Sequence, residues 1–154
     1  MKFKISYFYQ IRFFKPYQIP FSTALYDPKW FHKNGRYYKD KNGVYNGLRC
    51  EPLHPEPGNE ECLNCWSDHD PTKCTFIENY KKQLSEISFD EMLFYLTRTA
   101  ENIKQIEGFK EEPEIILIVY ETPDNKCSER DSIIELFANH GIELTEFKKE
   151  EWKD

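Results

Sequence analysis

A short polar segment near the carboxyl end of the chain combines residue types that can do chemistry. Its residues include Glu121, Glu129, Cys127, Ser128 and Arg130, which supply carboxylates, a thiol, a hydroxyl and a guanidinium. A thiolate at the start of a helix is stabilised by unpaired backbone N–H groups and by the helix dipole, and the same groups bind anions. We therefore take Glu121 and Cys127 as candidate catalytic residues. Ser128 and Arg130 are candidate ligands of a phosphate or carboxylate.

The same residues also have a purely structural interpretation. Ser128 can be only a helix cap, and Arg130 can be only a structural partner of Glu121. Cys127 can be a buried thiol with no chemical role. The sequence leaves both interpretations open.

Most familiar enzyme motifs are missing from the sequence. A phosphatase-like C-x5-R loop is absent, because the sixth residue after Cys127 is Ile133. The chain also has no Walker loop, no G-x-G-x-x-G turn, no G-x-S-x-G elbow and no H-E-x-x-H helix. These enzyme classes are therefore left without support.

The elements on either side place the polar segment in a fold. Residues 115–120 form an unbroken apolar run rich in β-branched side chains, which predicts a strand buried on both faces in the middle of a sheet. Apolar residues from Ile133 to Ala138 recur at helical spacing until Gly141, and residues 142–147 alternate as a second strand. In open α/β sheets, ligands bind in loops at the carboxyl ends of strands. The polar segment is such a loop.

Further elements complete the predicted fold. We expect strands over 3–8 and 19–26, and helices over 74–84 and 88–108. Ser88 and Glu91 form a capping box at the start of the longer helix. Strands near both ends of the chain, with helices between and after them, predict a single α/β domain over residues 1–154. We expect a Rossmann-like three-layer sandwich with a mostly parallel central sheet.

A cysteine-rich loop insertion over residues 33–74 interrupts this pattern with Gly, Pro, Asn and Asp and no sustained period. Its cysteines, spaced C-x11-C-x2-C-x8-C, are Cys50, Cys62, Cys65 and Cys74. A C-x2-C pair places two thiolates on one turn at the separation that a tetrahedral metal needs. The loop has few apolar residues, whereas structural zinc can supply on the order of 10 kcal/mol of folding free energy. We predict a closed, structural zinc site.

Three alternatives to four thiolate ligands stay open. His54 or His69 can each replace one cysteine as a ligand. The cysteines can be incidental thiols of the loop. A redox pair is the third alternative, but a thioredoxin-like C-x-x-C directly follows a strand and opens a helix, whereas Cys62 follows Pro, Gly and acidic residues.

The net charge and the aromatic content of the chain limit the kinds of ligand and partner that it can bind. The net charge of -6 argues against a general phosphate-binding surface, although a local basic patch stays possible. The chain has twelve Phe, ten Tyr and three Trp but only 39% hydrophobic residues, so much aromatic surface must be half-exposed.

The first sixteen residues mix basic and apolar side chains, namely Lys2, Lys4, Arg12 and Lys15 among aromatic residues. They lack the uninterrupted apolar core and the small-residue cleavage site of a signal peptide. No window of the sequence approaches the roughly 18 apolar residues of a membrane span. We therefore expect a cytoplasmic protein without a membrane partner.

Several short motifs occur in a recognisable order. They are Ser6-Tyr7-Phe8 with Arg12, the segment 21–31 with Ser22 and Trp30, Tyr120-Glu121, Cys127-Ser128-Glu129-Arg130, and Gly141-Ile142-Glu143. In these motifs the chain resembles the family catalogued as domain of unknown function 488, over most of its length outside the insertion. The common form of that family has Cys-His-Arg, whereas this chain has Cys-Ser-Glu-Arg, which is one residue longer and lacks the imidazole. The resemblance implies an α/β fold and no settled reaction. It also implies that a set of residues converges at one end of the sheet: Ser6, Arg12, Ser22, Trp30, Glu121, Cys127 and Arg130.

Two functions fit these observations. In the first, a polar pocket at the carboxyl ends of the strands binds an anion of nucleotide type, or a nucleic-acid end, through Arg12 and Arg130, with catalysis left open. Stacking surfaces for a base would come from Tyr7, Tyr26 and Trp30. In the second, the protein is a non-catalytic interaction module, such as a regulator or inhibitor, whose aromatic, acidic surface and zinc loop bind a protein partner.

Overall fold

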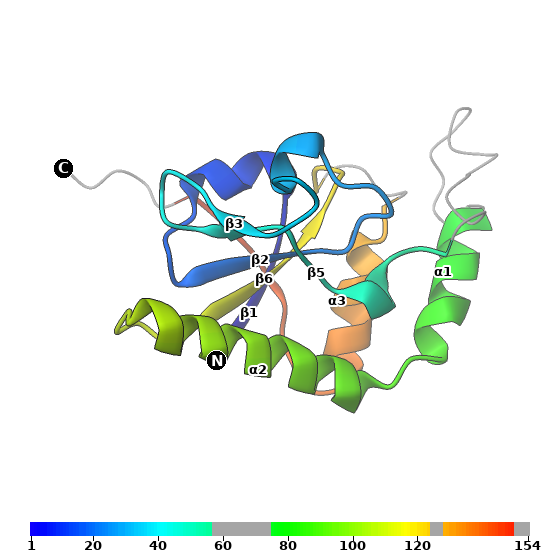
Figure 1. The fold of residues 1–154 in the computed structure, drawn as a ribbon. Helices are drawn as coiled ribbons and strands as arrows, with labels where there is room; N and C mark the ends of the chain where they lie inside the picture. The colour runs from blue at the N-terminus through cyan, green and yellow to red at the C-terminus, as the bar shows by residue number, and fades with distance from the viewer. Residues whose placement is uncertain (57–74, 124–127, 150–154) are drawn as a thin grey trace.

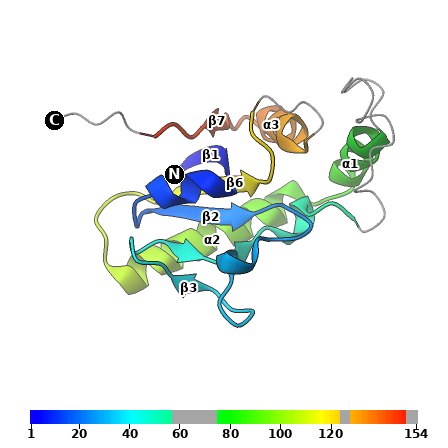
Figure 2. The same cartoon turned by 90° about the horizontal axis from the view of Figure 1, so that it is seen from above.

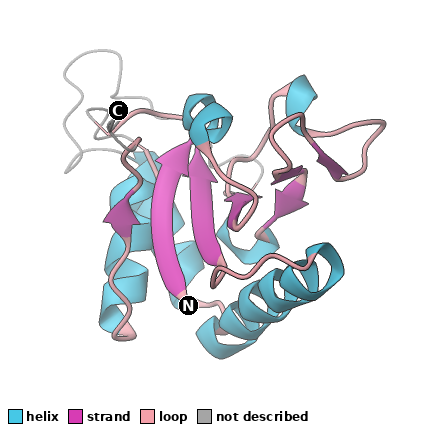
Figure 3. Cartoon of the chain, turned by 90° about the vertical axis from the view of Figure 1, so that its left-hand side faces the viewer, coloured by secondary structure: helices cyan, strands magenta, loops and turns pink. Residues whose placement is uncertain are grey.

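The centre of the protein is a five-stranded sheet with the strand order β5-β2-β6-β1-β7, in which every pairing is parallel (Figure 1). The computed structural model describes residues 1–56, 75–123 and 128–149. The strands of the sheet are β1 (Lys2–Tyr7), β2 (Gln18–Ser22), β5 (Leu48–Arg49), β6 (Glu114–Val119) and β7 (Thr145–Glu146). Figure 3 shows neighbouring strands of this sheet as arrows that point the same way.

The innermost strand is β6, and each of its residues is buried. It pairs with β1 on one side and with β2 on the other, so that Ile115 lies between Phe3 and Ile19. A strand buried on both faces reads as a continuous apolar run, which is why the sequence reveals it. The predicted central strand is confirmed, except that Tyr120 follows the strand and is exposed.

The described α-helices cover one face of the sheet. They are α1 (Thr75–Ser85), α2 (Phe89–Glu107) and α3 (Arg130–Asn139). The helices share one core with the strands, formed among others by Ile5, Leu117, Tyr80, Leu96 and Phe137. Figure 2 shows α1 lying beside α3, and the two helices contact each other.

The two ends of α2 have the predicted caps. Ser88 Oγ accepts a hydrogen bond from the backbone N–H of Glu91 at 3.4 Å. Gly108 ends the helix with a φ of 71°, in the left-handed region that glycine adopts without a steric penalty. The helix therefore begins and ends where local sequence chemistry specifies.

Short 3-10 helices and loops cover the other face of the sheet. The 3-10 helices there are η1 (Phe8–Phe13) and η2 (Lys29–Phe31). Their apolar residues form a second core with Ile116 and Ile118 of β6, which includes Phe8, Ile11, Phe14, Phe31 and Phe147. The three-layer α/β sandwich is confirmed, and its third layer is built of 3-10 helices and loops.

The described part of the predicted insertion, residues 33–56, contains regular structure. An antiparallel pair is formed by β3 (Tyr38–Lys39) and β4 (Tyr45–Asn46), and η3 (Glu51–Leu53) follows β5. β5 joins the main sheet through its pairing with β2. The remainder of the predicted insertion lies outside the described residues.

Two predicted strands are shorter in the structure than the sequence suggests. β2 ends at Ser22, and the next residue, Thr23, donates hydrogen bonds from its backbone N–H and from its hydroxyl to the carbonyl oxygen of Ile118, at 2.9 Å each. The strand predicted over residues 142–147 is reduced to Thr145–Glu146, which pairs with Lys4 and Ile5 of β1. In the described segments, no helix combines the length and the apolarity that a membrane span requires.

Candidate functional site

The carboxyl ends of β1, β2 and β6 meet at one edge of the sheet. The pairing of Tyr7 with Val119, and of Ser22 with Ile118, brings these strand ends level. Successive side chains of a strand point to opposite faces, and Ile5 packs with the helices. Ser6 therefore points to the η1 face and Tyr7 to the helix face, so the polar groups at this edge fall into two clusters.

Arg130 is the centre of the cluster on the helix face. Its side chain is only 3% exposed, and its Nη1 forms an ion pair with Glu146 of β7. Nη2 donates a hydrogen bond to the backbone carbonyl of Glu121 at 2.7 Å, and the guanidinium lies over the ring of Tyr7 at 5.9 Å. Nε is buried and has no hydrogen-bond partner among the described residues. Of the three guanidinium nitrogens, Nε is therefore the one that has no hydrogen-bond partner in the described part of the chain and can donate to a ligand.

Two buried carboxyl groups lie beside Arg130. Burial, together with repulsion from Glu121, raises the pKa of Glu129 to about 8. The pKa of Glu121 is also raised by burial, and its Oε2 is buried without a partner in the described part of the chain. Attraction to Arg130 opposes both shifts but is the smaller effect. Glu129 therefore changes its charge close to neutral pH.

Of the two residues predicted at the start of α3, the structure describes Ser128 but not Cys127. Ser128 is buried, and its Oγ accepts a hydrogen bond from the backbone N–H of Arg130 at 3.0 Å. The bond spans two residues, as in a serine turn, and it precedes the N-cap position of α3, which is Glu129 and has no side-chain cap hydrogen bond. Cys127 lies outside the described residues, so the thiol chemistry proposed for it stays a prediction.

A second polar cluster lies on the η1 face at the end of β2. Ser22 donates a hydrogen bond to Asp27 Oδ1, and Nε2 of His32 bonds Asp27 Oδ2 at 2.6 Å. The Asp27 side chain is 3% exposed, and Arg49 Nε lies 3.8 Å from it. Ser22 is completely buried. Its hydroxyl therefore serves Asp27, and it is not open to a substrate as a nucleophile.

His54 connects this cluster to β5. Its Nε2 donates to the backbone oxygen of Ser22 at 2.9 Å, and its Nδ1 accepts from Arg49 Nη2 at 2.6 Å. Burial lowers the pKa of His54, and the neighbouring Arg49 lowers it further. Both ring nitrogens of a neutral imidazole are thus engaged. Binding of zinc by His54 would require breaking one of these hydrogen bonds.

No motif of the sequence identifies Asp27, His32 and Arg49 as members of one polar cluster. Asp27 precedes Pro28, and such a pair is typical of a turn. A carboxylate in such a turn, followed five residues later by an imidazole, is the one local signal that was present. The partnership with Arg49 depends on β5, which has no periodic signal in the sequence.

The predicted zinc ligands are only partly described. Cys50 is fully buried in the main core, and burial raises the pKa of its thiol to about 12. Cys62, Cys65 and Cys74 lie outside the described residues, as does His69. Within the described ranges, the structure has no group of three or more residues that could hold a metal ion. The zinc site therefore stays a prediction.

Three further predicted ligand residues lie apart from Arg130. Arg12 is exposed in η1, with its guanidinium over the ring of Tyr9 at 3.8 Å, and it borders a hollow formed by the first residues of the strands. η1 carries the chain back along the face of the sheet, which separates Arg12 from Arg130. Trp30 is 49% exposed and meets the ring of Phe8 edge-on at 6.1 Å. Tyr26 is exposed and directly precedes Asp27 of the second polar cluster.

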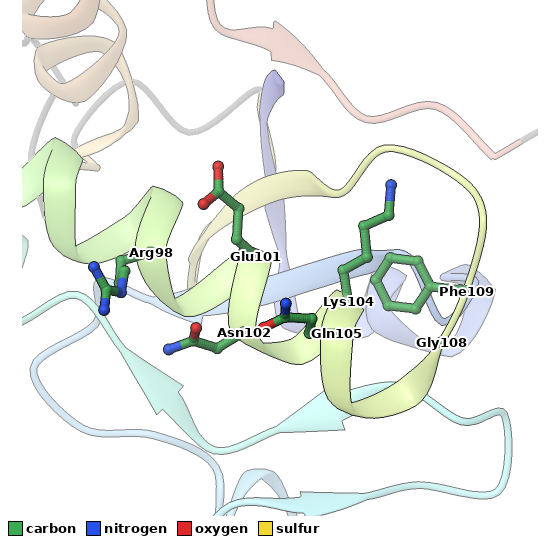
Figure 4. Close-up of a pocket in the computed structure, with 7 residues that line it drawn as sticks. All are labelled: Arg98, Glu101, Asn102, Lys104, Gln105, Gly108 and Phe109. Atoms are coloured by element: carbon green, nitrogen blue, oxygen red, sulfur yellow. The ribbon is translucent and has the colours of Figure 1, made fainter.

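Other hollows are less suited to bind a specific ligand. Figure 4 shows one of about 500 Å³ along the outer side of α2, where Arg98, Glu101 and Lys104 point in different directions. Side chains of one helix that fan outward do not converge on a ligand. Another, of about 550 Å³, lies beside His54 and is bordered by Glu86 of the residues that follow α1.

The fold and this site define an α/β protein with a parallel sheet and a titratable carboxyl cluster at the carboxyl edge of that sheet. No protein-family model, curated protein or solved structure matches the chain. The resemblance to the family of domain of unknown function 488 therefore stays a prediction.

Proposed function

We propose that the protein binds a small anionic ligand at the carboxyl edge of the sheet, beside Arg130, and that binding is coupled to the protonation of Glu129. One observation carries this proposal. Glu129 is a buried carboxyl group with a pKa of about 8, next to a guanidinium whose Nε has no partner among the described residues. Groups with strongly shifted pKa values are concentrated at functional sites.

The charges around Arg130 decide which protonation state accepts an anion. If Glu121, Glu129 and Glu146 were all ionised, their combined charge would repel an anion from a single guanidinium. Protonated Glu129 removes one negative charge and supplies an O–H donor, while Arg130 supplies the N–H of its Nε. Hydrogen bonds from these donors to an anion are of the strong, charge-assisted kind.

Groups from every element packed around Glu129 set its titration. Glu121 after β6 and Arg130 of α3 act on Glu129 directly, and Glu129 in turn acts on Tyr80 of α1. Glu146 of β7 and Tyr7 of β1 contact Arg130. The protonated form of Glu129 predominates below its pKa of about 8. Affinity for an anion is therefore highest below this pH and falls as the pH rises through it.

The surroundings of the edge favour a ligand with a flat ring as well as a charged group. Tyr120 directly follows β6 and is 49% exposed, and its ring lies 5.0 Å from that of Phe8. Exposed aromatic rings stack with nucleobases. A nucleoside monophosphate combines both features, and its phosphate is the group that we assign to Arg130.

The test is titration calorimetry with sulfate, whose charge is constant near neutral pH, and with adenosine monophosphate. For a ligand that binds only the protonated form, a rise from pH 6.5 to pH 9 weakens the apparent affinity about tenfold. The variant Glu129→Gln keeps a neutral donor, so we expect it to bind with an affinity that does not change with pH. Glu135→Gln, an exposed position of α3, is the matched control.

Two results would overturn the proposal. One is the absence of heat from both ligands at pH 6.5 in folded protein. The other is an affinity for sulfate that is the same at both pH values in the unmodified protein.

A further inference from the structure

A separate charged hollow lies at the opposite end of the sheet, at the amino ends of β1, β2 and β6. It has a volume of about 1210 Å³ and lies between the segment that follows η1 and the residues that follow β7. The charged residues that line it are Lys2, Lys4, Arg12, Lys15, Lys148 and Glu114. We call it the basic groove. Its five cations and one carboxylate contrast with the net charge of -6 of the whole chain.

The single carboxylate of the basic groove is already neutralised. Glu114 Oε1 lies 2.9 Å from Lys4 Nζ and accepts a hydrogen bond from Gln18 Nε2 at 3.2 Å. Lys2, Arg12 and Lys148 are exposed and make no ion pair with any residue that the structure describes. Their charges are therefore available to an anionic partner.

Aromatic rings alternate with the cations. The Arg12 guanidinium lies over the ring of Tyr9 at 3.8 Å, and Lys149 Nζ lies over the ring of Phe13 at 4.4 Å. Tyr9 and Phe13 also contact each other, with their centroids 6.0 Å apart. Phe13 lines the basic groove, and Tyr9, which is 54% exposed, extends this aromatic surface beyond its rim through the contact with Phe13.

We propose that the basic groove binds single-stranded nucleic acid. Phosphates of the strand would contact Lys2, Arg12 and Lys148, and a base would stack on the exposed aromatic surface of Tyr9 and Phe13. Proteins that bind single strands combine a positively charged groove with rings on which bases stack. A double strand, whose bases are already stacked on one another, cannot use the aromatic rings. The groove is distinct from the carboxyl edge, so this proposal does not depend on the one made there.

The test is fluorescence anisotropy with labelled oligonucleotides of thymidine and of uridine, each twelve nucleotides long. Three phosphate contacts predict that the logarithm of the binding constant falls with the logarithm of salt concentration with a slope of about -2. Arg12→Ala and Lys148→Ala should each weaken binding about fivefold to tenfold. Arg98→Ala, at an exposed position of α2, removes the same charge elsewhere and should change nothing.

Tyr9→Ala distinguishes a nucleic-acid site from a site for any polyanion. Loss of one base stacking contact should weaken binding about tenfold, while inorganic polyphosphate should be bound equally by both proteins. The proposal is overturned if oligonucleotides do not bind at 50 mM salt. It is equally overturned if Tyr9→Ala has no effect, since the groove then recognises charge alone. Glu129→Gln should leave oligonucleotide binding unchanged, which separates this test from that of the carboxyl edge.

Discussion

Glu129→Gln should change how the stability of the protein depends on pH. The pKa of Glu129 in the folded protein is about 8, against an ordinary value of 4.5. Between these values the folded protein holds a proton that the unfolded chain has lost. The free energy of unfolding therefore falls as the pH rises from about 4.5 to about 8. Above that range Glu129 is ionised in both states and no longer makes the free energy of unfolding depend on pH.

The pKa difference sets the size of this effect. Each pKa unit corresponds to 1.36 kcal/mol, so the shift from 4.5 to about 8 amounts to about 5 kcal/mol across the interval. Because Glu121 titrates in the same cluster, part of this loss belongs to the pair and not to Glu129 alone. The unmodified protein loses free energy of unfolding between pH 4.5 and about 8. We expect this loss to be smaller by about 3 kcal/mol or more in Glu129→Gln.

Urea denaturation at intervals from pH 5 to pH 9 measures this dependence. The unmodified protein should lose stability steadily up to pH 8, whereas Glu129→Gln should have a flatter profile and be the more stable protein at pH 9. Glu143→Gln removes an exposed carboxylate and should follow the unmodified protein. Parallel profiles for Glu129→Gln and the unmodified protein would refute the electrostatic reasoning.

Two further predictions concern the cap of α2 and the cysteines. Ser88→Ala removes the acceptor for the backbone N–H of Glu91 and should cost about 1 kcal/mol in urea denaturation, whereas Ser85→Ala, outside the cap, should cost less. Purified protein should contain one zinc ion per chain by mass spectrometry under native conditions, and Cys62→Ser should lose it together with stability. Fully folded protein that is free of zinc would contradict the second prediction.

The parts of the fold that could be predicted are those that local chemistry specifies. β6 is buried on both faces, so its continuous apolar run identified it without knowledge of its partners. The start and end of α2 followed from Ser88 and Gly108, which act within their own turns. The position of the polar segment after β6 followed from the same local pattern.

The third layer could not be anticipated from helical or strand periodicity. Phe8, Ile11 and Phe14 recur at intervals of three residues, which is the period of a 3-10 helix, and they all face the second core. This spacing was the available signal. β5 has only two residues and offered none.

The position of the candidate site in the fold could be predicted from the sequence, but its ion pair and its shifted pKa could not. The sequence placed Glu121 and Arg130 at one edge of the sheet. That Arg130 pairs with Glu146 depends on the register of β7 against β1, which no local pattern specifies. The raised pKa of Glu129 depends on its burial beneath neighbouring elements, and the separation of Arg12 from Arg130 depends on the direction of η1.

The central place of β6 has a consequence for how the chain acquires its structure during synthesis. β1 and β2 do not pair with each other, because β6 lies between them in the sheet. The hydroxyl of Thr23 bonds the carbonyl of Ile118, which is 95 residues further along the chain. At roughly 5–20 residues per second, a ribosome needs about 5–20 s to cover that distance. For that time the two early strands carry open backbone edges, so the nascent chain is most exposed to wrong pairing before its middle strand exists.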